Sequence, residues 1–459
     1  MFDLEFASKA LGVTPILPAA FSAPAPFATV TIDSRQVVPG SLFVAIPGPR
    51  FDGHDFIAEA AAKGCAAAIV SRPPEGPPPL PLLLVPDTQA ALTRLAIAWR
   101  ERVRPMVVAV TGSSGKTTVK EMIAACLAAR GGVHATRGNL NNHLGLPLTL
   151  LAMPADCRVL VAEMGMSAAG EIRHLASIAP PDVAVVTSIT AAHLEHLGSL
   201  ENIARAKAEL LEALAPSGLG IIPGDAPFGD LLRAACRGCV RTFGLAATDP
   251  ARAIDPRFEA GGQRFFLRLD PEGVTMEMRV RHPGRFMVAN AVAAAAAAHA
   301  AGADPATIAA AIAAFQPAAG RGGIRQSRHG FSVVDDTYNA NPGSMAVALE
   351  SLSHLAPPGR RVAVLGDMLE LGPTTRIIHA ELATAVRQAQ IDRLFTAGPC
   401  MAALHQAVAG DADRSALHAD DPAAWLGKIR SRIGAGDVVL VKGSRGMRME
   451  RIVQDLLAD

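Results

Sequence analysis

The chain has 459 residues, half of them hydrophobic, so it is long enough for two to four domains that each bury a core. Its formal net charge of +1 argues against a broad polyanion-binding surface, and we expect no nucleic-acid partner. Of the six cysteines, only Cys236 and Cys239 have metal or redox spacing, and no second pair completes a zinc site. Reduced thiols of a cytosolic protein are expected, with a redox pair as the alternative.

The amino-terminal residues do not resemble a targeting segment. Residues 1–5 lack the basic region and apolar core of a signal peptide. The most apolar run, residues 291–301, is nearly all alanine and too short to span a bilayer. We therefore expect a cytoplasmic protein without a membrane span.

Residues 1–104 predict a small α/β domain. Strands are expected at 29–32, 42–46, 66–70 and 82–85, with one helix after residue 55. Asp87 is placed to cap a further helix through Leu92, Leu95 and Trp99. Pro105 then marks the end of this domain.

Residues 107–118 predict a buried strand, a glycine turn and a helix, in that order. Gly112 and Gly115 let backbone N–H groups face an anion, and the helix N-terminus adds partial positive charge. Lys116 can reach terminal phosphates, and the Thr117 hydroxyl can bind Mg²⁺. The pattern indicates a phosphate loop, although Val110 stands where the strict motif has glycine. The alternative is a plain glycine turn with a lysine on its edge.

The rest of residues 105–320 alternates strands and helices, which is typical of a mainly parallel sheet. Glu163 ends a buried strand, where a carboxylate is well placed to hold Mg²⁺. Asn139 and Asn142 lie in a loop of small and amide residues that suits ligand contact. His193 follows the strand at 183–187. Each of these residues taken alone could have a purely structural role.

Lys207 lies on the apolar stripe of a helix that Ser199 can cap. Its helical neighbours three and four positions away are all apolar, so no carboxylate of the same helix pairs with it. Such a lysine must extend its amine to solvent, find a distant partner or lose its charge. A neutral amine could react with CO₂ to form a carbamate, which is a metal ligand.

Residues 321–459 predict strands at 331–334, 361–365 and 438–441, and each of these strands ends in polar residues. A hairpin around Pro271–Gly273 and an alanine-rich helix containing Asn290 precede this region. The strand ends carry Asp336, Tyr338, Asn339 and Asn341; Asp367; and Lys442, Ser444 and Arg445. Such clusters are what an open parallel sheet offers to a ligand, although each could be turn chemistry.

Nine segments, covering nearly the whole chain, resemble those of the Mur ligase family. They are residues 33–35, 51–56, 111–118, 138–142, 191–195, 206–209, 335–342, 366–372 and 442–445. The phosphate loop is shared by the wider family. The runs Asp336–Asn341 and Lys442–Arg445 are similar to the members that add D-alanyl-D-alanine.

The resemblance implies an α/β protein with the three-domain Mur ligase architecture. Residues 1–104 would bind the UDP-sugar. Residues 105–320 would form a central phosphate-loop, parallel-sheet domain for ATP, and residues 321–459 a C-terminal Rossmann-like α/β domain for D-alanyl-D-alanine. The implied reaction joins this dipeptide to UDP-N-acetylmuramoyl-tripeptide through an acyl phosphate, giving UDP-MurNAc-pentapeptide for peptidoglycan synthesis. We expect the enzyme to act as a monomer.

The resemblance also implies roles for individual residues. Lys116, His193 and Lys207 would be catalytic. Thr117 and Glu163 would hold one Mg²⁺, and His193 with a Lys207 carbamate formed from CO₂ would serve a second. ATP would contact Gly112, Ser113, Ser114, Gly115, Lys116, Thr117, Thr118, Asn290, Arg321 and Asp336. The other substrates would contact Ser34, Arg35, Asn139, Asn142, Tyr338, Asn339, Asn341, Lys442, Ser444 and Arg445.

One pair of residues departs from the family pattern. The family usually has His-Asn where this chain has Phe286 and Met287, and that asparagine faces adenine. Methionine offers only packing to a base edge, so we expect less adenine recognition through this position.

Three rival interpretations remain open. The first is another amide ligase, such as an amino-acid-adding Mur ligase or a folylpolyglutamate-synthase relative. Mur ligases that add a diamino acid carry an Asp-Asn-Pro-Arg run that is absent here. The second is a phosphate-loop switch that binds partners without making a bond, and the third is an inactive homologue.

Overall fold

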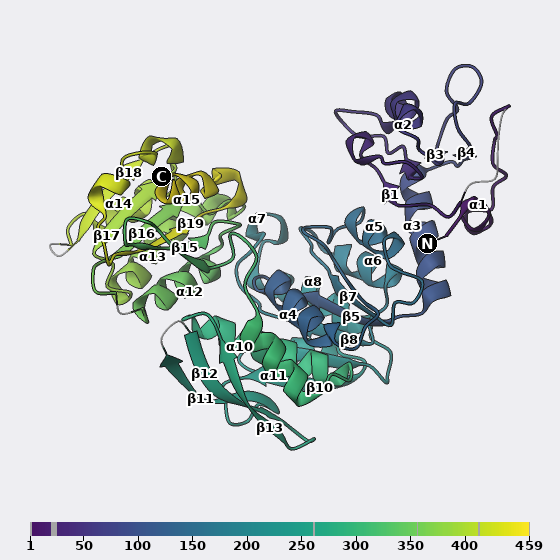
Figure 1. Cartoon of the computed structure of the whole chain (residues 1–459). Helices are drawn as coiled ribbons and strands as arrows, with labels where there is room; N and C mark the ends of the chain where they lie inside the picture. The colour runs from purple at the N-terminus through teal and green to yellow at the C-terminus, as the bar shows by residue number, and fades with distance from the viewer. Residues whose placement is uncertain (1, 20–24, 260–261, 356, 412–413, 459) are drawn as a thin grey trace.

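The structure is a computed structural model, and it describes residues 2–19, 25–259, 262–355, 357–411 and 414–458. Three α/β domains follow one another along the chain, each built around its own sheet. In Figure 1 the first and last domains lie on opposite sides of the central one. Among the described residues, no helix is both long enough and apolar enough to cross a bilayer.

The first domain contains a four-stranded parallel sheet in chain order, β1-β2-β3-β4. The strands are Val30–Thr31, Leu42–Val44, Ala67–Val70 and Leu82–Leu84, and the helices are α1 (Leu4–Leu11), α2 (Ile57–Ala62) and α3 (Thr88–Val103). As predicted, the Asp87 side chain caps α3 by accepting from two backbone N–H groups of its first turn.

Helix α3 joins the first domain to the central one. It packs against α5 (Gly145–Leu151), and the Trp99 ring nitrogen donates to the Met153 carbonyl at 3.0 Å. Buried side chains of both domains, including Leu92, Leu95 and Leu150, form one continuous hydrophobic cluster. These two domains therefore share a core.

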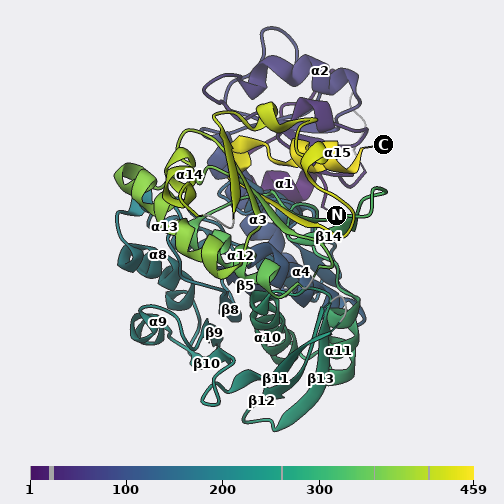
Figure 2. The same cartoon turned by 90° about the vertical axis from the view of Figure 1, so that its left-hand side faces the viewer.

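The central sheet has nine strands in the order β13-β12-β11-β10-β9-β8-β5-β7-β6. They are β5 (Met106–Thr111), β6 (Val133–Ala135), β7 (Val159–Glu163), β8 (Val183–Val186), β9 (Leu219–Pro223), β10 (Cys239–Gly244), β11 (Ala251–Glu259), β12 (Gly262–Leu269) and β13 (Val274–Val280). All neighbours are parallel except the antiparallel pairs β11–β12 and β12–β13. This confirms the predicted parallel sheet with an antiparallel hairpin, which Figure 2 shows at the end farthest from the N-terminal domain.

Helices cover both faces of the central sheet. Helices α4 (Lys116–Ala128), α10 (Arg285–Ala300) and α11 (Pro305–Ala314) bury the face that carries Val108 and Val110. Helices α5, α6 (Glu171–Ile178) and α8 (Leu200–Glu212) bury the other, and α7 (Leu194–Leu197) and α9 (Gly229–Ala235) complete the domain. Apart from Ala289, the residues of α10 from Val288 to Ala298 are all buried, and most are alanine, so the helix can pack closely.

The third domain has a six-stranded sheet in the order β14-β15-β19-β16-β17-β18. Its strands are β14 (Gly323–Gln326), β15 (Ser332–Asp336), β16 (Arg361–Gly366), β17 (Arg393–Ala397), β18 (Ser415–Ala419) and β19 (Val438–Lys442). Only β14 is antiparallel, at the edge. The helices are α12 (Pro342–Ser353), α13 (Thr375–Gln388), α14 (Ala402–Val408) and α15 (Glu450–Leu457). The sheet is Rossmann-like, and β15, β19 and β16 bring the predicted polar strand ends together.

Candidate active site

The predicted phosphate loop lies between β5 and α4, at the carboxyl ends of the parallel strands. Gly112 and Gly115 have φ angles of 147° and 82°, and Gly115 is the N-cap of α4. A Cβ on Gly115 would lie 2.7 Å from Oδ1 of Asn290, which is itself buried. The loop therefore needs glycine both for its backbone and for its approach to α10.

The segment after β8 holds the loop in shape. The Ser113 hydroxyl donates to the Thr190 carbonyl at 2.9 Å and accepts from the Thr190 N–H at 3.0 Å. The Ser114 N–H donates to the Ser188 hydroxyl, and the Ser113 N–H donates to the Ser188 carbonyl. These hydrogen bonds hold the backbone of the loop in place at the N-terminus of the 13-residue helix α4. Because the N-terminus of a helix attracts anions, this loop is suited to bind a phosphate.

Lys116 folds over this loop, where its amine donates to the Gly112 carbonyl at 2.8 Å. Burial lowers the pKa of the amine; the Glu163 carboxylate opposes that shift and the Arg321 guanidinium adds to it. Three of the predicted site residues, Lys116, Glu163 and Arg321, thus interact electrostatically around the loop. The negative charge of a bound phosphate would neutralise the positive charges of Lys116 and Arg321.

Glu163 ends β7, opposite Val110 of β5, and is 2% exposed. Its Oε1 accepts from Nδ2 of Asn141 at 2.7 Å, whereas its Oε2 has no hydrogen-bond partner among the described residues. A buried carboxylate oxygen left without a donor suits a cation, as predicted for Mg²⁺. Sequence reasoning missed Asn141, although it lies in the same amide-rich loop as Asn139 and Asn142.

The two asparagines that the sequence did indicate lie differently. Oδ1 of Asn142 accepts from the Gly145 N–H, at the first residue of α5, at 2.8 Å. Asn139 is exposed. Their contact with a substrate stays a prediction.

Lys207 is buried on α8, as its place on the apolar stripe predicts. It is 2% exposed, and its amine makes no hydrogen bond or ion pair with any residue that the structure describes. Burial is the main cause that lowers its pKa well below the ordinary value, and the Lys116 charge lowers it further. The carboxylate two residues on, Glu209, instead accepts from the Gly170 and Arg173 N–H groups at the start of α6. A neutral amine in this position can react with CO₂.

His193 precedes α7 with a left-handed backbone, at φ 57°. Its Nδ1 lies 2.6 Å from Oε2 of Glu370, in the third domain. Burial lowers the pKa of the imidazole; Glu370 opposes that shift, and the charges of Lys116 and Lys207 add to it. The ring's Nε2 makes no hydrogen bond with a described residue.

The donors around the loop fit a magnesium site that is completed by a ligand. The described residues contain no cluster of three or more His, Cys, Asp or Glu side chains able to hold a metal ion. Glu163 supplies one unpaired oxygen, His193 one ring nitrogen, and Thr117, which is 6% exposed, a hydroxyl. Mg²⁺ commonly binds through one or two carboxylates together with substrate phosphates and water, so this small set suffices.

The predicted substrate residues of the third domain lie close together, and several already have partners. Lys442 is buried, pairs with Asp336 at 2.7 Å and donates to the Asn339 carbonyl at 2.9 Å. Ser444 is buried and accepts from the Leu369 N–H. A role for Lys442 as the cation for a substrate carboxylate stays a prediction.

Arg321 and Arg445 lie over the ring of Tyr338 in this domain, and Asn341 contacts the central one. The Arg321 guanidinium lies 3.9 Å from the centre of the Tyr338 ring, and the Arg445 guanidinium lies 5.7 Å from it. Nδ2 of Asn341 donates to the Ser114 hydroxyl at 3.1 Å, across the domain boundary. The sequence predicts that Asn341 binds a substrate, whereas in the structure it contacts the phosphate loop.

The predicted UDP-binding residues lie after β1. Ser34 is buried, and its carbonyl accepts from the Lys63 amine at 2.9 Å. Arg35 is exposed and pairs with Asp33 at 2.8 Å, and the hydrogen bond from Arg35 is the main cause that lowers the pKa of Asp33 to about 2. Of these two predicted residues, only Arg35 has a side chain open to a ligand from solvent.

The two residues that depart from the family pattern lie at the start of α10. Met287 is 1% exposed and belongs to the core under the sheet, so it is not available to a base edge. Phe286 packs edge-on against the buried His282, with ring centres 4.8 Å apart.

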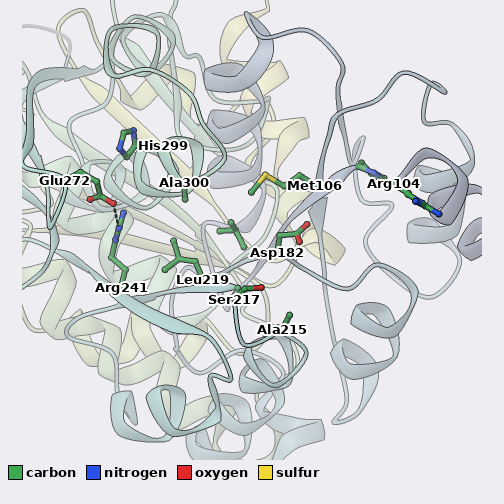
Figure 3. A pocket seen from close by; sticks show the side chains of 13 residues that line it. Arg104, Met106, Asp182, Ala215, Ser217, Leu219, Arg241, Glu272, His299 and Ala300 are labelled. Atoms are coloured by element: carbon green, nitrogen blue, oxygen red, sulfur yellow. Dashed lines mark hydrogen bonds and ion pairs between the residues drawn. The ribbon is translucent and has the colours of Figure 1, made fainter.

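A cavity also lies away from the phosphate loop. It has a volume of about 700 Å³ and opens near the amino ends of β5, β8 and β9, where Figure 3 shows Arg241 paired with Glu272. Ligands of open parallel sheets bind at the carboxyl ends of the strands. We therefore place the candidate active site at the phosphate loop.

Comparison with known proteins agrees with this fold. Residues 26–100 match the Mur ligase family catalytic domain, residues 110–298 the Mur ligase middle domain, and residues 320–445 the Mur ligase glutamate ligase domain. The chain therefore belongs to the Mur ligase family.

Particular relatives narrow the comparison. The chain is 39% identical to the UDP-N-acetylmuramoyl-tripeptide–D-alanyl-D-alanine ligase of Escherichia coli, over 93% of each chain. The structure superposes on MurF from Acinetobacter baumannii with a TM-score of 0.88 and 31% identity, covering 100% of this chain and 99% of that one. MurF ligase from Thermotoga maritima, solved in complex with ADP, gives a TM-score of 0.80 and 30% identity, over 93% of this chain and 96% of that one.

Proposed function

We propose that the chain is an ATP-dependent ligase that joins D-alanyl-D-alanine to UDP-N-acetylmuramoyl-tripeptide. The observation that carries the proposal is the glycine loop between β5 and α4, with the buried and partly unpaired carboxylate of Glu163 at the end of the neighbouring strand β7. The names of the similar ligases, and their coverage of this chain, support the choice of substrates.

The reaction follows from what these residues can do. The loop amides and the Lys116 amine hold the phosphates of ATP while the tripeptide carboxylate displaces ADP from the γ-phosphate. The resulting acyl phosphate is attacked by the dipeptide amine, which loses a proton, and inorganic phosphate leaves. Bound Mg²⁺ would neutralise phosphate charge during the transfer, held by Thr117 and Glu163. His193 and a carbamate on Lys207 would serve a second ion.

We assign residues 1–104 to the UDP-sugar, 105–320 to ATP and 321–459 to D-alanyl-D-alanine. One copy of the chain contains every candidate residue, which supports a monomer as the active form. We further propose a cytoplasmic location, where ATP and a UDP-linked precursor would meet.

The direct test measures ADP and UDP-MurNAc-pentapeptide with ATP, Mg²⁺ and the UDP-linked tripeptide, with and without D-alanyl-D-alanine. The two products should form in equal amounts, and only when both organic substrates are present. ATP hydrolysis at the same rate without them would indicate a nucleotide switch instead.

A competition separates this ligase from its relatives. D-alanyl-D-alanine, D-alanine, L-lysine and meso-diaminopimelate are offered at equal concentration, and the products are weighed by mass spectrometry. Incorporation of a single amino acid would reassign the nucleophile but keep the ligase chemistry.

A further inference from the structure

Glu370 belongs to the segment Gly366–Gly372, to which the proposed reaction gives no role. Its Oε2 lies 2.6 Å from Nδ1 of His193, and its carbonyl accepts from the Glu195 N–H at 3.1 Å. Glu370 and His193 are 177 residues apart and come from different domains. Figure 1 shows α7, which His193 precedes, reaching toward the third domain.

Both residues of this contact have a left-handed backbone, with φ of 57° at His193 and 63° at Glu370. A non-glycine residue adopts this conformation only where its surroundings over-determine it, and such residues cluster at functional sites. Gly372 packs beside the same contact, since a Cβ on it would lie 3.5 Å from the Glu195 Cα.

The Glu370 carboxylate is presented by an anchored loop. The Leu369 N–H donates to the Ser444 hydroxyl at 2.9 Å, and the Met368 N–H donates to Nε2 of the fully buried His379 at 3.0 Å. The Ser444 N–H donates to the Asp367 carbonyl. Glu370 thus follows the third domain as a rigid body, whereas His193 belongs to the central one.

A carboxylate that accepts from Nδ1–H fixes a histidine in the tautomer whose Nε2 lone pair is free for a cation. His193 follows by three residues Thr190, which holds Ser113 of the phosphate loop through two hydrogen bonds, so the ring belongs to the segment that borders this loop.

We propose that Glu370 is a positioning residue that holds His193 with its Nε2 available to the phosphate-loop site, so that the third domain completes the cation site of the central domain by docking. This inference rests on the proposed function for the identity of the bound cation, but the geometry of the pair does not depend on it.

The first test reads the histidine itself, without metal or nucleotide. Protein labelled with ¹⁵N-histidine is studied by NMR at alkaline pH, and the His193 signals are assigned by their loss in His193→Gln. We expect the Nδ1–H tautomer in the unmodified chain and a shift toward Nε2–H in Glu370→Ala. Glu370→Gln keeps an acceptor oxygen and should retain part of the preference. Alanine and glutamine are non-glycine residues, as glutamate is, so neither replacement removes the cost of the left-handed backbone at this position.

The matched control is Asp420→Asn, which removes the carboxylate from another histidine contact of the third domain, to His418 at 3.3 Å. Binding of Mn²⁺ with a non-hydrolysable ATP analogue should weaken roughly 10- to 100-fold in Glu370→Ala and stay unchanged in Asp420→Asn. In a His193→Gln background, Glu370→Ala should cause no further loss of kcat, because it acts through the histidine.

An unchanged tautomer in both Glu370 variants, or additive losses in the double variant, would overturn the inference while leaving the ligase proposal intact. If the unmodified chain makes no pentapeptide, the proposed function fails, and the tautomer measurement still decides the role of the Glu370–His193 pair.

Discussion

At the scale of single residues, the site depends on polar groups that burial leaves without partners. Oε2 of Glu163 is buried and accepts no hydrogen bond from a described residue, and Lys207 is 2% exposed and donates none to one. Burying a polar group without a hydrogen-bond partner costs roughly 1–3 kcal/mol of folding free energy, so we infer that a ligand pairs with the Glu163 oxygen.

Replacing Lys207 tests the carbamate. Lys207→Ala should lower kcat by at least about 100-fold, because a metal ligand is lost, while formate or acetate should restore part of it by entering the space. Lys207→Arg should stay inactive with or without these acids, because guanidinium forms no carbamate. Ordinary turnover in Lys207→Ala would contradict the proposed carbamate.

His282 gives the stability of the fold a defined pH dependence. Burial is the main cause that lowers its pKa from 6.5 to about 4, so the unfolded chain binds the proton more tightly than the folded one. The contribution, about 3 kcal/mol at most, is fully present above pH 6.5 and is lost as the pH falls toward 4. Urea unfolding across this range should show stability rising with pH.

His282→Gln should flatten only part of that slope. Burial also lowers the pKa of His134 and His379, which keep their own contributions. An equal slope in both proteins would mean that the pKa of His282 is not lowered by folding.

At the scale of elements, the phosphate loop shows how glycine geometry and ligand binding are linked. Gly115→Ala should weaken ATP binding by about 10-fold or more, because the added methyl group meets Oδ1 of Asn290 and displaces either the loop or the amide. Isothermal titration with a non-hydrolysable ATP analogue measures this.

Gly131→Ala is the matched control. Gly131 also has a positive φ, 68°, shortly after the end of the same helix, and a Cβ there would meet nothing within 4 Å. Both variants should lose about 1 kcal/mol of stability from the backbone alone, but only Gly115→Ala should lose affinity. Equal affinities would place the nucleotide elsewhere.

Elements determined by nearby residues were predictable from the sequence, and distant pairings were not. The caps Asp87 and Ser199, the loop at Gly112–Thr118 and the burial of Lys207 follow from local spacing, and the structure confirms them. The bonds of Glu163 with Asn141 and of His193 with Glu370 join residues that are 22 and 177 positions apart in the sequence. Periodicity carries no information about such pairs.

Two predicted substrate residues, Lys442 and Asn341, have partners within the protein for the same reason: these partners come from distant parts of the sequence. Lys442 and Asn341 have side chains suited to bind a substrate, and the sequence alone gives no reason to pair them within the protein. In the folded chain, β15 and β19 are neighbours, so Asp336 reaches Lys442. Docking of the third domain likewise brings Asn341 to Ser114.

At the scale of the whole molecule, the third domain touches the nucleotide site through few bonds. Asn341→Ser should shift the free protein toward more separated domains, because serine keeps a capping oxygen for α12 but is too short to reach Ser114. One hydrogen bond of about 1 kcal/mol corresponds to a roughly fivefold change in population. Small-angle scattering without ligands measures it.

Ser344→Ala provides the control, since it removes the other half of the α12 capping box and leaves the bond to Ser114. It should lower the stability of the third domain without expanding the molecule. Equal expansion in both variants would trace the effect to the helix cap.

Helix α3 bears on the order in which the nascent chain can fold. Leu92, Leu95 and Trp99 leave the ribosome with the first domain, but part of the surface that covers α3 is made later, in α5 and at Met153. Trp99 precedes Met153 by 54 residues. During synthesis of that stretch, part of the apolar face of α3 stays uncovered, and transiently exposed hydrophobic surface of this kind is prone to aggregation until the central domain covers it.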